Sequence, residues 1–306
     1  MHFLELKRFA YRIVDNAVPR NVEKEKFIMK RNEQMKEIEM KLQAGVEEYF
    51  QSDKYATLLK MMSKFHNYSF NNCLLIMLQC PYASYVAGFS TWKNSFHRSV
   101  KKGEKAIRIV APCPHKHIDE DTGEETVYTT YRATSVFDIS QTMQIPNTEE
   151  IKLGIKELHG DVKDYDCILN AIVETSPVPV SYEQTVGGIK GFYAPVENRI
   201  VVGIGMSELQ TIKTLLHEIS HALLHNPDAI KERKTDRDTK EIEAESTAFI
   251  VSSLLGLDTS EYSFEYIANW AGKYNLKAVN KAMENIKDTA NQLYDEIQQN
   301  FQQNKK

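Results

Sequence analysis

The stretch LQTIKTLLHEISHALLH (residues 209–225) contains His217 and His221, four positions apart, with Glu218 directly after the first histidine. Residues four apart on a helix lie one turn above each other on the same face, so both imidazoles can reach one metal ion. Glu218 lies about 100° around the helix, where it can reach a water on that metal without being a ligand itself. The spacing therefore predicts a helix with His217 and His221 as metal ligands and Glu218 as general base.

The same stretch has the pattern of a helix that packs on a core. Its apolar residues recur at three- and four-residue intervals, and they are Ile212, Leu216, Ile219 and Leu223. An accidental pair of surface histidines is the alternative to a metal site. That alternative weakens if a third ligand can be found nearby.

A third ligand is expected from a neighbouring helix, because a catalytic zinc ion usually has three protein ligands and one open position. The segment KEIEAES (240–246) offers three carboxylates. Glu241 follows Asp238 by three residues and fits a capping box, which predicts a structural role at the helix start. Glu243 lies on the same helix face as Thr247, Ile250 and Leu254, which is expected to face the core. Glu245 is rotated away from that face by part of a helical turn. Glu243 is favoured as the third ligand, and Glu245 is the alternative.

Composition describes an ordinary globular chain. It has 306 residues, of which 42% are hydrophobic and 26% charged, and this length is enough for two domains. The formal net charge of −4 excludes a basic nucleic-acid binder of the histone kind, so any such site must be local. No apolar run is long enough for a membrane helix, and charges interrupt the first residues, so a cytoplasmic protein is expected.

The first half is predicted to be mixed helix and sheet. Residues 21–66 have helical periodicity, and short β-like runs begin near residue 84, with a longer strand predicted over 127–139. The segment Cys113–His117 is expected to be a loop rather than a metal site, because Pro114 and the tight spacing make a shared tetrahedral site awkward. The polar stretch SQTMQIPNTEE (140–150) predicts a domain boundary.

The second half is predicted to combine a small sheet with several helices, which gives an α+β fold with domains over 25–145 and 149–306. The expected strands are VPVSY, GFYAP and RIVVG, within 178–203. The expected helices cover 149–158, 163–174, 206–225, 239–255 and 275–303, and 226–239 is expected to be a loop. If residues 199–202 form an edge strand, they can hold a peptide by strand addition.

Basic charge is concentrated in the first half. Between Lys54 and Arg108 there are nine Lys and Arg residues against a single acid, Glu104, and aromatic residues are interleaved with them. This mixture suits single-stranded nucleic acid, whose bases stack on aromatic rings while cations follow the phosphates. The candidate binding residues are Tyr68, Asn71, Trp92, Lys93, Lys101, Lys102 and Arg108. Phe70 and Phe96 fit a buried core better.

Several motifs resemble one known family. HEISHALLH with EIEAES, followed by AFIVSSLLGLDTSEYSFEYIANWAG (248–272), is similar to the ImmA/IrrE-like zinc metallopeptidase domain of ArdC-type antirestriction proteins. YSFNNCLLIMLQ (68–79), VAGFSTWK (86–93), VKKGEKAIRIVAP (100–112) and VFDISQT (136–142) resemble the N-terminal domain of that group. The resemblance implies zinc, single-stranded DNA as a partner, and Glu243 as a metal ligand. Residues 1–24 and the helix after about 280 lie outside it.

Two functional hypotheses follow. In the first, the chain is a zinc-dependent peptidase that its N-terminal domain recruits to single-stranded DNA. In the second, it is a DNA-protecting protein whose metal only stabilises the fold. Glu218 favours the first hypothesis, because a purely structural site does not use a general base beside an open position.

Overall fold

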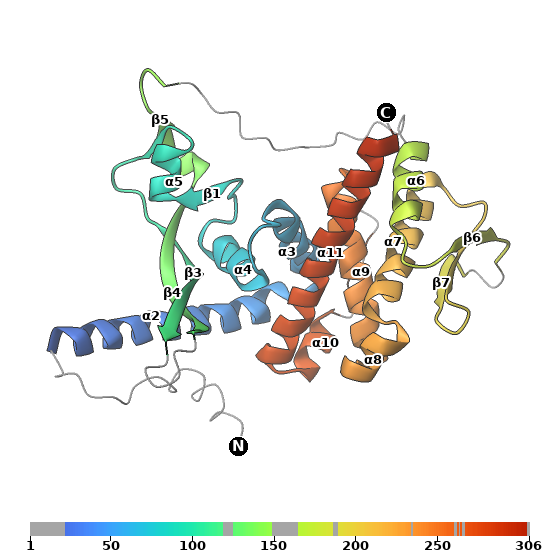
Figure 1. Ribbon diagram of the computed structural model, residues 1–306, viewed down its shortest axis with the longest axis horizontal. Coiled ribbons are helices and arrows are strands. Elements are labelled where there is room, and N and C mark those ends of the chain that lie inside the picture. The colour runs from blue at the N-terminus through green and yellow to red at the C-terminus, as the bar shows by residue number, and fades with distance from the viewer. Residues whose placement is uncertain are drawn as a thin grey trace.

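The computed structural model describes residues 22–118, 125–148, 165–185, 189–233, 235–259, 262, 264 and 267–304 (Figure 1). The helix predicted over 21–66 is two helices, α2 (Val22–Tyr49) and α3 (Ser52–Lys64). Phe50, between them, is 2% exposed, and its ring lies 5.2 Å from that of Tyr55 and 6.2 Å from that of Trp270. The chain turns at this point because Phe50 is buried in the core.

Helix α4 (Phe70–Gln79) covers the edge of a strand with its side-chain amides. Asn72 donates to the carbonyl of Val110 and accepts from its N–H, both at 2.9 Å. The side-chain amide of Gln79 likewise donates to the carbonyl of Arg108 and accepts from its N–H, both at 2.9 Å. The two amides thus act as a partner strand and satisfy backbone groups that would otherwise be unpaired.

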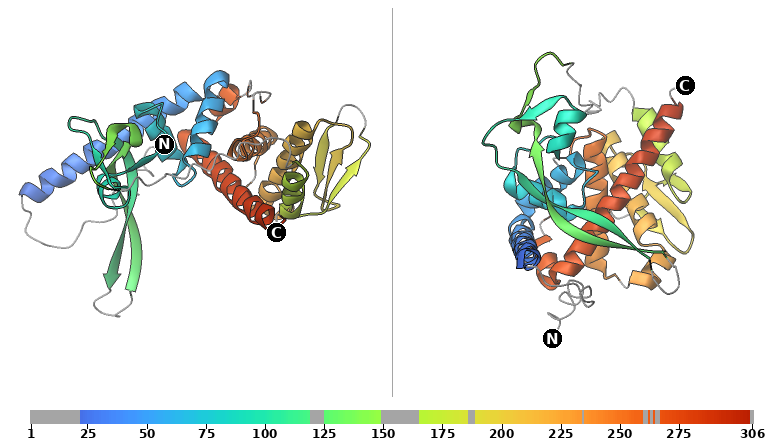
Figure 2. Two further views of the ribbon diagram at one scale, coloured as in Figure 1. Left: turned by 90° about the horizontal axis from the view of Figure 1, so that it is seen from above. Right: turned by 60° about the vertical axis from the view of Figure 1, so that its left-hand side comes forward.

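The first half contains two small antiparallel sheets. One has the order β1-β4-β3, and the other pairs β2 with β5. The bounds are β1 (Val86–Gly88), α5 (Phe89–Asn94), β2 (Arg98–Val100), β3 (Ile107–Ile118), β4 (Glu125–Asp138) and β5 (Thr142–Gln144). The predicted long strand over 127–139 is confirmed as β4. Figure 2 shows the β3–β4 hairpin extending away from the helical body.

The expected loop at Cys113–His117 is wrong, because these residues belong to β3. Backbone N–H groups along β3 point alternately toward β4 and away from it. The N–H of Val110 points away from β4, to Asn72, and Pro112 and Pro114 stand two and four residues further along, at positions of the same kind. A proline at this phase removes no hydrogen bond to β4, so the strand continues through both residues.

The second half contains a three-stranded sheet against α7, as Figure 1 shows. The strands are β6 (Val180–Glu183), β7 (Gly191–Ala194) and β8 (Arg199–Gly203), in the order β6-β8-β7. The three predicted strands are therefore present. Strand β8 lies in the centre and pairs on both sides, so residues 199–202 are not the expected edge.

Helices form the rest of this half. They are α6 (Tyr165–Thr175), α7 (Glu208–Leu224), α8 (Pro227–Arg233), α9 (Arg237–Leu254), α10 (Ile267–Lys273) and α11 (Leu276–Asn304). Four predicted helices are confirmed to within a few residues, whereas the helix expected over 149–158 lies outside the described residues. Helix α8 occupies part of the segment 226–239 that was expected to be a loop.

One hydrophobic core connects both halves. It runs from Ile38 in α2 through α3 and α4 to Phe301 in α11. Helix α3 packs against α9, and the hydroxyl of Tyr55 lies 2.9 Å from that of Ser246. The boundary expected between 145 and 149 stays a prediction. In the part of the chain that the structure describes, no helix is long and apolar enough to cross a membrane.

Candidate metal centre and nucleic-acid interface

Helices α7 and α9 pack closely and position the candidate metal centre. Ser207 is the N-cap of α7 and accepts from the N–H of Gln210, which fixes where the helix begins. Ala244 and Ala248 on α9 are fully buried, and their small side chains let the two helices approach. His217 and His221 face this contact from α7.

The two histidines lie together, as their spacing predicts. Their Nε2 atoms are 3.1 Å apart. The Oε2 atom of Glu241 lies 3.6 Å from Nε2 of His217 and 3.8 Å from Nε2 of His221. These three residues form a group that could hold a metal ion, with ligand atoms within 4.8 Å of one another.

The carboxylate beside both Nε2 atoms is that of Glu241, which differs from the sequence-based assignment of Glu243. The expected capping box fails because the N-cap of α9 is Asp236, which accepts from the N–H of Thr239. Helix α9 therefore begins before Asp238, and Glu241 lies within the helix with its side chain free to reach α7. Glu243 is fully buried and points to other partners.

The far ring nitrogen of His217 is held by a carboxylate. Its Nδ1 atom lies 2.9 Å from Oε2 of Glu245, and Oε1 of Glu245 lies 3.4 Å from the ammonium of Lys213. Glu245, the alternative ligand expected from the sequence, therefore lies on the side of His217 away from Glu241. A carboxylate in this position orients a metal-binding histidine.

The far ring nitrogen of His221 meets a third histidine. Its Nδ1 atom lies 2.9 Å from Nδ1 of His225, and Nε2 of His225 lies 2.9 Å from Oε2 of Glu243. Glu243 is also paired with Arg233 of α8 and accepts from Nδ2 of Asn285 at 3.2 Å. Sequence reasoning missed His225, although its spacing of four from His221 was visible.

Electrostatics around these side chains favour a cation. Burial lowers the pKa of His217, but the nearby carboxylates of Glu241 and Glu245 outweigh it and raise the pKa to about 10. The neighbouring rings of His217 and His221 hold the pKa of the Glu241 carboxyl far below its usual range. The centre is therefore rich in negative charge and binds a proton tightly when it holds no other cation.

The donor set fits a divalent ion such as zinc. Two nitrogens at the usual zinc distance of about 2.0–2.1 Å, in tetrahedral geometry, are about 3.3 Å apart. The observed 3.1 Å between the Nε2 atoms is close to this value. Two imidazoles and one carboxylate match zinc sites that keep a position open.

Glu218, the general base expected from the sequence, is buried beneath strand β7. Its side chain is 7% exposed, and burial raises the pKa of its carboxyl. Strand β7 runs directly over it: a Cβ atom at Gly191 would lie 2.6 Å from Cγ2 of Thr214 and 3.5 Å from Cγ of Glu218. Glycine is needed at position 191 because β7 approaches α7 so closely.

Trp92 is not available to stack on a base. Its side chain is fully buried, and its Nε1 atom donates to the carbonyl of Phe137 at 2.8 Å. The rings of Tyr85 and Phe96 pack against it at 5.7 and 5.3 Å. The expectation of an exposed Trp92 is wrong because a neighbouring lysine does not determine which face of α5 is buried.

The other predicted nucleic-acid residues divide into two groups. Tyr68 is half-buried and donates its hydroxyl to the carbonyl of Val86 at 2.9 Å, and Asn71 is also half-buried. The cations are exposed, and they are Lys93, Lys101, Lys102 and Arg108. The ammonium of Lys101 donates to the carbonyl of Ser140 at 2.8 Å. The structure therefore presents the predicted charges but not the predicted rings.

Exposed rings lie nearby at positions that sequence reasoning did not select. Phe89 is 53% exposed and precedes Lys93 by four residues on α5, so the two share a face of the helix. Tyr82 is 74% exposed, and Tyr131 on the hairpin is 54% exposed. The spacing of Phe89 and Lys93 was a signal that could have been read from the sequence.

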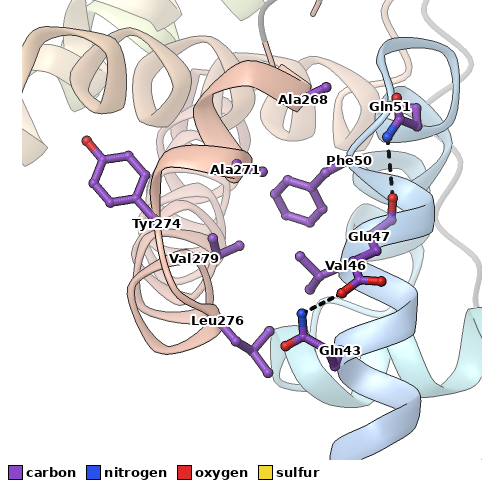
Figure 3. Close-up of a pocket in the computed structure, with 11 residues that line it drawn as sticks. Gln43, Val46, Glu47, Phe50, Gln51, Ala268, Ala271, Tyr274, Leu276 and Val279 are labelled. Carbon is purple, nitrogen blue, oxygen red and sulfur yellow. Dashed lines mark hydrogen bonds between the residues drawn. The ribbon is translucent and has the colours of Figure 1, made fainter. Parts of the chain in front are cut away.

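A pocket of about 430 Å³ lies away from the candidate metal centre, between α2, α10 and α11. Figure 3 shows the side chains that line it, with Phe50, Val46 and Leu276 directed into the space. The centre itself is built from α7 and α9, so this pocket is a separate feature.

Fold and site together define a mixed helix-and-sheet protein with a candidate metal centre between two packed helices. Residues 29–138 match the family described as the N-terminal domain of anti-restriction factor ArdC, so this part of the chain is similar to that domain.

Two comparisons extend beyond that domain. An uncharacterized protein of Bacillus anthracis is 29% identical over an alignment 351 residues long, which covers 92% of this chain and 57% of that protein. The chain therefore spans little more than half the length of this relative. Crystal structures of the antirestriction protein ArdC from plasmid R388 have TM-scores of 0.53 for the metal-free form and 0.50 for the Mn(II)-bound form. Their sequence identities are 22% and 19%, and they cover 77% and 76% of this chain and 86% and 85% of theirs, so they share its fold.

Proposed function

We propose that the chain is an ArdC-like antirestriction protein that binds single-stranded DNA and has a zinc-dependent peptidase site. The observation that carries the proposal is the convergence of His217, His221 and Glu241 beside the buried carboxyl of Glu218. The ArdC-type domain over 29–138 and the shared fold support the antirestriction role. A cytoplasmic location stays a prediction.

His217, His221 and Glu241 would hold the ion. When bound, zinc at such a site supplies a Lewis acid for amide hydrolysis. Glu218 accepts a proton from the attacking water and passes it to the leaving amine. Its raised pKa suits both steps, because a carboxyl that titrates nearer to neutral pH can act first as base and then as acid.

Single-stranded DNA would bind over α5 and the turn after β2. Phe89 offers an exposed ring, and Lys93 on the same helix face offers a charge for a phosphate. Lys102 and Arg108 add exposed cations. Affinity should depend on salt and vary little with sequence, since these contacts go to the backbone and to base faces.

The test combines metal analysis with three variants. Purified protein should hold about one equivalent of zinc, and His217→Ala or His221→Ala should remove it. Glu218→Gln should keep the zinc and the DNA affinity but lose cleavage of any protein that the wild type cuts in the presence of single-stranded DNA. If Glu218→Gln protects DNA in cells as well as the wild type does, the peptidase role is wrong, and a DNA-protecting protein with a structural metal takes its place.

A further inference from the structure

A hydrogen-bonded chain leads away from His221 into the protein core. It passes from Nδ1 of His221 to Nδ1 of His225 and from Nε2 of His225 to Glu243, with 2.9 Å at each step. Arg233 and Asn285 pair with the other oxygen of Glu243. His225 is 4% exposed and Glu243 is fully buried, so each depends on these partners.

The hydrogen-bond partners of Glu243 determine which nitrogen of each histidine carries a proton. Glu243 faces two groups that can only donate, the guanidinium of Arg233 and the amide nitrogen of Asn285, so its carboxylate acts as an acceptor. Nε2 of His225 must then carry a proton and donate it. A neutral His225 has its lone pair on Nδ1, and Nδ1 of His221 must donate to it.

The consequence reaches the candidate metal centre. His221 with its proton on Nδ1 has a free lone pair on Nε2, the atom that lies 3.1 Å from Nε2 of His217. On the other ligand, Nδ1 of His217 donates to Glu245, so Nε2 is the atom that a metal ion would bind once its proton has left. With a metal ion bound, both imidazoles would therefore direct a lone pair to the same point.

We infer that His225 and Glu243 are positioning residues, which hold His221 in the tautomer and orientation that a metal ion needs. This inference rests on the proposed function for its metal, but the tautomers belong to the protein itself. His225 can take this position because it is the C-cap of α7, with φ −128° and ψ 23°, so it has left the helical geometry.

Three glutamates of α9 thus serve one centre in three ways. Glu241 lies beside the Nε2 atoms, Glu245 holds His217 directly, and Glu243 holds His221 through His225. Helix α8 takes part through Arg233, which is 26% exposed and closes the chain from the outer side. The segment between the ligand helices therefore supports the centre structurally.

The test is made on the full chain labelled with ¹⁵N-histidine. Two-bond proton–nitrogen correlation spectra should show His221 protonated on Nδ1 and His225 protonated on Nε2, both with and without zinc. A proton on Nδ1 of His225 would overturn the inference. If the wild type binds no zinc, the proposed function fails, but the spectra of the metal-free protein still decide the tautomers.

Zinc affinity provides the second measurement, by competition with a chromophoric chelator. His225→Phe should weaken zinc binding roughly 10- to 100-fold, as expected for loss of a group that orients a ligand. Glu243→Gln, which keeps the size of the side chain, should weaken it in the same direction. Asp228→Asn on α8 changes a carboxylate that is 91% exposed and should leave affinity unchanged. Unchanged zinc affinity in folded His225→Phe and Glu243→Gln would contradict the positioning role.

Discussion

Lys287 of α11 places its Nζ atom 3.0 Å from the carbonyl oxygens of both Met62 and Phe65, at the end of α3. One turn earlier, Glu284 accepts from the N–H of Phe70 at 3.0 Å, at the start of α4. Helix α11 therefore satisfies backbone groups at the ends of two helices from the first half of the chain. Burial lowers the pKa of Lys287, which is 2% exposed.

Replacing Lys287 should destabilise the whole fold. Lys287→Ala removes the ammonium donor to the carbonyls of Met62 and Phe65, although Phe65 still accepts from the N–H of Tyr68. It also opens a cavity between α3 and α11, and the two effects together should cost about 2–4 kcal/mol of unfolding free energy. Urea denaturation followed by circular dichroism measures this. Lys281→Ala, at an exposed position on the same helix, is the control and should change stability by less than about 0.5 kcal/mol. Equal stability of the two variants would show that the contacts to α3 contribute nothing.

The glutamate that binds the metal can be identified by paired substitutions. Glu241→Gln should reduce zinc affinity more than roughly 100-fold, because it removes a ligand rather than a group that orients one. Glu245→Gln should have a smaller effect, and Glu232→Gln, at an exposed position, should have none. Isothermal titration with zinc gives the comparison. Should Glu243→Gln lose more affinity than Glu241→Gln, the assignment from the sequence would be restored.

Trp92 and Phe89 should respond differently to substitution. Trp92→Ala empties a fully buried site and should lower stability by about 3–5 kcal/mol. Phe89→Ala should leave the melting temperature nearly unchanged and weaken single-stranded DNA binding by about 1–3 kcal/mol, since one stacking surface is lost. Thermal melts and fluorescence anisotropy with an oligothymidine measure the two effects. A Phe89→Ala variant with full DNA affinity would remove α5 from the interface.

Salt dependence should report the cationic contacts. Lys102→Gln should lower the slope of log affinity against log salt by about 0.7, the value expected for one phosphate contact on a single strand. Lys277→Gln removes an exposed charge from α11 and should leave the slope unchanged. The measurement is a series of anisotropy titrations at increasing salt. A slope that falls equally in both variants would mean that only net charge matters.

Asp138 should make stability depend on pH. Its carboxylate accepts from the N–H groups of Ser84, Tyr85 and Ser140 at 2.8–3.0 Å. Burial opposes ionisation, but these hydrogen bonds outweigh it and lower the pKa of Asp138 below its ordinary value of 3.8. Because the folded pKa is the lower one, the stabilisation is complete above about pH 4 and is lost as pH falls towards the folded value.

Asp138→Asn should therefore be less stable than the wild type by about 1–3 kcal/mol at pH 7, and the difference should shrink below about pH 4. Denaturation curves at several pH values measure this. Asp295→Asn, at an exposed position, serves as control. If the stability difference between Asp138→Asn and the wild type stayed constant from pH 7 to pH 3, the ionisation of Asp138 would not be its cause.

Local periodicity determined much of the fold and the centre of the site. The four-residue spacing of His217 and His221 places both rings on one helix face whatever the helix packs against, so the structure confirms this pair. The strands after residue 178 and the helix from Leu276 were predictable for the same reason, since side chains that repeat with the period of a strand or helix share one face.

Tertiary structure decided which glutamate of α9 meets the histidines. Glu241, Glu243 and Glu245 are two residues apart, and on a helix each step turns the side chain by about 200°. The N-cap at Asp236 leaves Glu241 inside the helix, and the packing of α9 against α7 brings Glu241 rather than Glu243 to the two Nε2 atoms. The burial of Trp92, the central place of β8 and the contact from Asn285 to Glu243 also depend on packing between segments far apart in the chain. A sequence pattern specifies the faces of an element, but which face meets which neighbour is fixed only when the elements pack together.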